Sequence, residues 1–77
     1  MSVVVEAAQI RLLDMARIED AESLTAALIA SPETPVDLSD CTGMHTAVLQ
    51  VLLIFKPITT GLAKNPALAT WLPPFLN

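Results

Sequence analysis

The sequence predicts an α/β fold built as a single domain over residues 1–77. Three observations support this prediction. The chain is too short to build a second hydrophobic core. Strand-like and helix-like segments follow one another in the order β, β, α, β, α, β, α, which is typical of an α/β layer and not of a helical bundle. Hydrophobic residues make up 53% of the sequence and charged residues only 16%, a composition rich enough for such a core.

Two strands are expected at the start of the chain, over residues 3–6 and 9–13. The first is β-branched, and the second alternates polar with apolar residues, the period of a half-buried strand. We expect the two to pair as a hairpin. Because Ala7-Ala8 is a poor turn signal, a single bent strand is the alternative.

A helix is expected over residues 20–30. Asp20 is placed to accept hydrogen bonds from the free N–H groups of the first turn, and Pro32 ends the helix because the residue before a proline avoids the helical region. Four residues at helical spacing form one apolar face: Ala21, Leu24, Ala27 and Leu28.

The middle of the chain predicts a short strand over 36–39, a loop over 40–43 and a second helix over 46–55. This helix is apolar on every side except at Gln50. A helix of that kind must be covered on both faces. A sheet covers one face, and either a neighbouring helix or a partner protein covers the other.

The last third predicts a final strand over 58–61 and a last helix. Asn65 is a suitable cap for this helix, and Pro66 fits its first position, where a missing N–H is harmless. Pro73-Pro74 is expected to stop it. Whether these residues pack on their own sheet or on a neighbouring molecule stays open.

Charge and hydropathy exclude two classes of partner. The net charge is −4 and the four basic residues are scattered, whereas nucleic acid binding needs clustered Lys and Arg. The longest apolar run, 47–55, contains Gln50 and is far shorter than the roughly 20 residues of a membrane span. With so little polar surface, we expect some apolar area to stay exposed and to mark a homodimer or hetero-oligomer contact.

The N-terminus and the cysteine content indicate the compartment. The first residues contain Glu6, no basic start and no small-residue cleavage site, so we do not expect a signal peptide. The single cysteine, Cys41, excludes an internal disulfide and fits a reducing environment. We therefore expect a cytoplasmic protein.

The residues offer little for catalysis, so no catalytic residue, metal ligand or cofactor is predicted. His45 and Cys41 are the only residues of their types, and the two glycines are too far apart for a phosphate-binding loop. We interpret Cys41 as a small buried residue and not as a nucleophile paired with His45. The acidic pairs are interpreted as caps and turns, and the polar groups are too few to converge in a ligand pocket.

Thr46 is the strongest candidate for a functional residue. A hydroxyl at the start of a helix is a preferred cap, and the same position can accept a phosphoryl group that the free N–H groups and the helix dipole would hold. His45 beside it is able to cap the loop or to titrate. Both hypotheses for Thr46 stay open at this point.

The run DLSDCTGMHTAVLQVLL at 37–53 resembles the STAS family, the domain of bacterial anti-sigma factor antagonists, which typically shows DLSGVTFIDSSGLQVLL. Segment 16–21 is similar to the family's entry into its first helix, and 65–72 to its last helix. Thr46 falls on the family's phosphorylated Ser. His45 replaces its Asp, Ala47 its second Ser and Val48 its Gly.

The resemblance implies a small mixed β-sheet with helices packed on one side and a protein that binds other proteins in signalling and regulation. A kinase would phosphorylate Thr46 and release the partner, an anti-sigma factor or a related kinase. The alternative is a constitutive subunit of a larger complex, such as a lipid-transport ABC assembly. The implied partner-binding residues are the corner and the second helix: Met44, His45, Thr46, Val48, Leu49 and Leu52.

Overall fold

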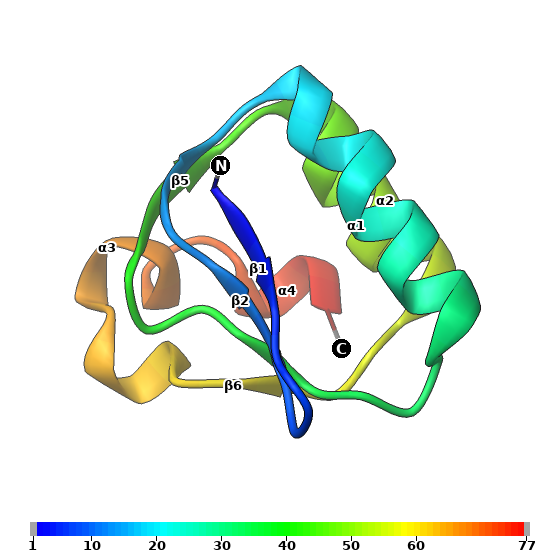
Figure 1. Cartoon of the computed structure of the whole chain (residues 1–77). Coiled ribbons are helices and arrows are strands. Elements are labelled where there is room, and N and C mark those ends of the chain that lie inside the picture. The colour runs from blue at the N-terminus through cyan, green and yellow to red at the C-terminus, as the bar shows by residue number, and fades with distance from the viewer. Residues whose placement is uncertain (1, 77) are drawn as a thin grey trace.

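The computed structural model describes residues 2–76, and the side chains of residues 2–74. It shows an α/β fold, as predicted, in which helices pack against a mixed four-stranded sheet (Figure 1). The strands of this sheet lie in the order β1 Val3–Val5, β2 Ile10–Leu12, β4 Val36–Asp37 and β6 Thr59–Thr60. A second sheet pairs β3 Asp14–Ala16 with β5 Cys41–Met44. The helices are α1 Ile18–Ala30, α2 Thr46–Phe55, the 3-10 turn η1 Leu62–Lys64, α3 Pro66–Ala69 and α4 Pro73–Leu76.

The predicted hairpin is present. β1 and β2 pair antiparallel, with Val3 opposite Leu12. The Glu6 N–H donates to the Gln9 carbonyl at 2.8 Å, and this bond closes the turn although the two alanines between them are poor turn formers. The alternative of one bent strand is therefore wrong.

The four-stranded sheet turns an apolar face toward the core and carries an ion pair on its other face. β2 pairs parallel with β4, and β4 pairs parallel with β6. On one face Ile10 lies beside Val36, and both side chains are buried in the core. On the opposite face Arg11 lies beside Asp37 and forms an ion pair with it at 3.6 Å. This register directs the hydrophobic residues of the sheet toward the helices that pack on it.

The two-stranded sheet was not predicted. The chain bends after β2 at Asp14, the first residue of β3, whose φ of 55° lies in the left-handed region. The predicted strand over 9–13 is shorter than expected, and the predicted loop over 40–43 is wrong because these residues form most of β5. At this pairing a Cβ on Gly43 would lie 3.0 Å from the sulfur of Met15, the flexible end of a side chain.

Helices α1 and α2 lie side by side and start at the same end of the molecule (Figure 1). The cause is the parallel pairing of β3 and β5, since each of these strands leads directly into one of the two helices. The His45 N–H donates to the Ala16 carbonyl at 2.8 Å and so ties the two entry points together.

The start of α1 differs from the prediction. The helix begins at Ile18 with Arg17 as its N-cap residue, and Asp20 occupies the third helical position. The carboxylate of Asp20 still serves the helix end, because it accepts a hydrogen bond from the Arg17 N–H at 2.7 Å. The predicted role of Asp20 as the cap itself is wrong, whereas the C-terminal end of α1 at Ala30 is as predicted.

The bounds of α2 are confirmed, and the neighbouring helix α1 packs against it, but within this chain the cover of α2 is incomplete. Val48, Val51 and Leu52 are buried in the core. The side chain of Ile54 is 75% exposed. One face of α2 therefore packs inside the domain while the other meets solvent. No helix described over residues 2–76 has the length and apolar character needed to cross a membrane.

The last third packs on its own domain, which resolves the question left open above. Asn65 caps α3 and Pro66 is its first residue, as predicted. Leu68 and Leu72 are both buried in the core. The last helix is shorter than predicted, and the two prolines at 73–74 begin α4 instead of stopping a helix, since proline is well suited to a first turn.

Candidate protein-contact site

The corner between β5 and α2 is built around His45. Its backbone is extended, with φ −65° and ψ 149°, and its Nδ1 accepts a hydrogen bond from the Ala47 N–H at 3.0 Å. His45 is therefore the N-cap of α2. The hypothesis that Thr46 caps the helix is wrong, because Thr46 is the first helical residue.

Thr46 is exposed at this corner. Among the described residues no hydrogen bond or ion pair engages its hydroxyl. A hydroxyl without a structural partner is open to modification by another protein. However, the Ala47 N–H, which was expected to help hold a phosphate, is already bound to His45 Nδ1.

The corner is anchored to the core by Asn65. This side chain is only 8% exposed, and its Nδ2 donates to the carbonyls of Leu38 and Cys41 on either side of the turn between β4 and β5. Its Oδ1 accepts from the Leu68 N–H at 3.5 Å and caps α3. One buried amide thus fixes the start of β5, and with it the position of the corner that follows.

The structure brings only part of the predicted partner surface to the outside. His45 and Thr46 are exposed, and Met44 and Leu49 are partly buried. Val48 and Leu52 are 0% exposed and belong to the core. These two residues are wrongly assigned to the contact surface, because a partner cannot reach them while the domain is folded.

A shallow groove lies next to the corner and was missed by the sequence analysis. We call it the α1 groove. Its lining residues are Ile18, Ala21, Glu22, Thr25, Ala26 and Ile29 of α1, with Ala47 of α2. The residues of α1 in this lining follow one another at spacings of three or four along the helix, so they form a second stripe, which shares Ala21 with the apolar face predicted from the sequence. The signal that could have revealed it is Ile18 and Ile29, which fall outside that face.

Two large apolar side chains that line the α1 groove are exposed. Ile18 is 58% exposed and Ile29 is 67% exposed, one at each end. The residues between them are small or polar, so the floor of the groove is shallow. The two isoleucines form the ends of the groove. Ala47, adjacent in sequence to Thr46, forms part of its wall.

Cys41 is not placed for nucleophilic chemistry. It is buried, and its thiol donates to the Gly43 carbonyl at 3.1 Å. Burial raises the pKa of the Cys41 thiol, so the reactive thiolate is disfavoured. His45 Nδ1 is bound to a backbone amide and not to the thiol.

The acidic residues near the end of β4 are structural. Arg11 forms ion pairs with Asp40 at 2.7 Å, Asp37 at 3.6 Å and Glu6 at 4.0 Å. Asp37 also accepts hydrogen bonds from the N–H and hydroxyl of Ser39. In the described part of the chain no group of His, Cys, Asp and Glu residues could hold a metal ion.

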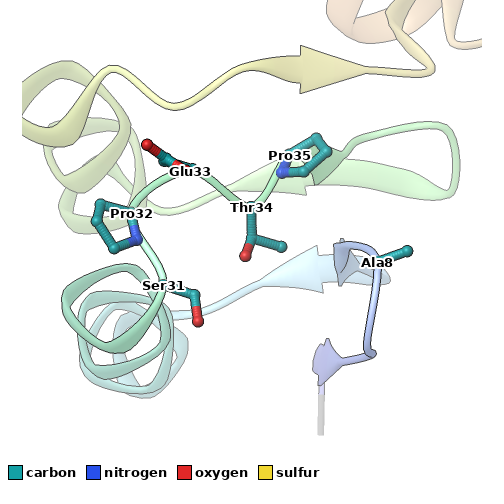
Figure 2. A pocket seen from close by; sticks show the side chains of 6 residues that line it. All are labelled: Ala8, Ser31, Pro32, Glu33, Thr34 and Pro35. Atoms are coloured by element: carbon teal, nitrogen blue, oxygen red, sulfur yellow. The ribbon is translucent and has the colours of Figure 1, made fainter.

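A second surface hollow lies between the turn that follows α1 and the β1–β2 turn (Figure 2). Its side chains diverge: the Glu33 carboxylate extends away from the hydroxyls of Ser31 and Thr34, and Ala8 lies apart from them on the other turn. Catalysis needs polar groups that converge on one point. This hollow offers no such point.

Comparison with known proteins finds no match for this chain among family models, curated proteins or solved structures.

Proposed function

We propose that this chain is a non-catalytic protein-binding module whose contact surface joins the exposed corner at His45 and Thr46 to the α1 groove. The observation that carries the proposal is the position of Ala47. It lines the groove, and it directly follows the exposed Thr46. A partner that covers the groove would therefore lie next to the Thr46 hydroxyl.

Apolar exposure supports the binding role. Complete burial of one isoleucine side chain is worth about 1.5–3 kcal/mol. Ile18 and Ile29 are more than half exposed, and both border the same groove. Exposed apolar side chains that border one surface groove are more informative about a protein contact than single ones scattered over the surface.

The resemblance to the STAS family supports a regulatory role in the cytoplasm for this surface. In that family phosphorylation at the position of Thr46 releases an anti-sigma factor or kinase. Phosphorylated Thr46 would carry about −1.5 to −2 charges beside an apolar contact. The partner would have to desolvate this charge, so binding would weaken. We propose that the chain acts as such a partner-switching adaptor.

The second candidate is a constitutive subunit of a larger complex, such as a lipid-transport assembly. One observation favours it. The first turn of α2 is already capped by His45 Nδ1, so the corner is complete without a phosphate. A permanent interface would cover Thr46 and need no switch.

The test is affinity capture of partners from the native cell with tagged protein, followed by mass spectrometry of the captured proteins and of Thr46. Thr46→Asp is compared with wild type and with Thr60→Asp, which adds the same charge at an exposed residue of β6. The switch predicts that Thr46→Asp weakens capture by at least about tenfold, because a charge is placed in the contact.

Three results separate the candidates. Phosphate on Thr46 together with loss of the partner in Thr46→Asp supports the switch. An unmodified Thr46 in a stoichiometric complex supports the constitutive subunit. Equal capture by wild type, Thr46→Asp and Thr60→Asp would show that the corner is not part of the contact surface.

A further inference from the structure

We propose that the α1 groove binds an amphipathic helix of a protein partner, and that lysine or arginine residues flank the apolar ridge of this helix. The inference rests on the proposed binding function and specifies the chemistry of the partner. Shape and charge support it separately.

The shape of the groove fits a helix. Ile18 and Ile29 stand three turns apart, about 16 Å along α1. Between them Ala21 and Ala26 keep the floor low, and Ala47 forms a wall on the neighbouring helix. A helix that lies along a groove inserts side chains at i, i+3, i+4 and i+7, a span of about 10.5 Å, so these side chains fit between the two isoleucines.

The charge of the groove specifies the partner. Glu22 is the one charged residue that lines it, and Glu19 lies one turn away on the same side of α1. Both carboxylates are exposed, and no residue within the described part of the chain forms an ion pair with either. A partner that covers Glu22 must supply a positive charge, because a buried unpaired carboxylate is costly.

The same charge disfavours a second copy of this chain. Two α1 helices packed face to face would place two Glu22 carboxylates in one apolar contact. No basic residue lies between Ile18 and Ala30 to compensate them. Like charges brought together in an interface weaken association. The basic helix is therefore the occupant that matches the groove.

The experiment measures binding of the whole chain to two synthetic stapled helical peptides by fluorescence anisotropy. The peptides share one Leu/Ile ridge, flanked by Lys and Arg in the first and by Glu in the second. We expect the basic peptide to bind at least about tenfold more tightly, and its affinity to fall as salt is raised, because exposed charge pairs are screened.

Two pairs of variants locate the site. Glu22→Lys should weaken the basic peptide by about three- to tenfold, whereas Glu33→Lys, the same change outside the groove, should leave binding within about twofold of wild type. Ala26→Trp fills the groove and should weaken binding more than about tenfold, while Ala67→Trp on α3 should not. Ala26 and Ala67 are exposed, so neither substitution alters the core. Circular dichroism confirms that each variant is folded.

The inference is overturned if both peptides bind equally or not at all, or if Ala26→Trp binds like wild type. It is also overturned if sedimentation shows a wild-type dimer that Ala26→Trp converts to a monomer, since a second copy would then occupy the groove. A native partner that is lost with Thr46→Asp but retained by Ala26→Trp and Glu22→Lys would leave the proposed function standing and refute the groove alone.

Discussion

Asn65 allows the sharpest test of how this fold is held together. Removal of its amide in Asn65→Ala takes away the cap of α3, worth about 1 kcal/mol. It also leaves two buried carbonyls without the amide donor. The Leu38 carbonyl keeps a second bond from the Cys41 N–H at 3.2 Å, so we count one desolvation penalty of about 1–3 kcal/mol and not two.

The expected loss for Asn65→Ala is therefore about 2–4 kcal/mol of unfolding free energy. A domain of 77 residues has only about 4–12 kcal/mol in total, so this loss is easily measured by urea denaturation followed by circular dichroism. A loss below about 0.5 kcal/mol, the range of ordinary surface substitutions, would refute the reasoning.

Asn65→Asp is the matched control because it keeps the capping oxygen and changes only the donor. The carboxylate would face two carbonyl oxygens, which raises the pKa of the new side chain. A raised folded-state pKa means that the folded protein binds the proton more tightly than the unfolded chain. Stability is then greatest at low pH and falls as pH rises through the folded pKa. A pH-independent difference from wild type would contradict this arrangement.

The other predictions concern glycine and the helix cap. Gly61→Ala should cost about 2 kcal/mol or more, because its φ is 77° and a new Cβ would lie 2.3 Å from a neighbouring carboxylate oxygen. Gly43→Ala should cost less than about 1 kcal/mol, since its nearest neighbour is the flexible end of a methionine; thermal unfolding compares the two. His45→Ala should cost about 1 kcal/mol and Thr46→Ala less than about 0.5 kcal/mol, because the imidazole is the cap. Equal costs for the last pair would show that the cap is misassigned.

Assignment of the cap to His45 changes how the corner is interpreted. A cap at Thr46 would have bound its hydroxyl to the helix, and modification would then have disrupted the fold. His45 is the cap instead, and the Thr46 hydroxyl makes no hydrogen bond with any of the described residues. Charge can therefore be added at Thr46 with its main effect on a partner and not on stability.

Local sequence signals determined the parts of the fold that depend on neighbouring residues. The bounds of α2, the end of α1, the hairpin pairing of β1 with β2, and the cap at Asn65 all follow from periodicity, proline and capping chemistry. These effects act within one or two turns, so they can be recognised without knowledge of the fold.

Only the tertiary structure decided the rest, because it depends on contacts between residues distant in the sequence. β3 and β5 have no β-branched run like that of β1 and form because they pair with each other. The burial of Val48 and Leu52 follows from how α2 rotates onto the core. The α1 groove exists because parallel strands deliver two parallel helices side by side, which brings Ala47 against the outer stripe of α1. Periodicity can show that a helix has an apolar stripe, but only packing decides which stripe is buried and which is left for a partner.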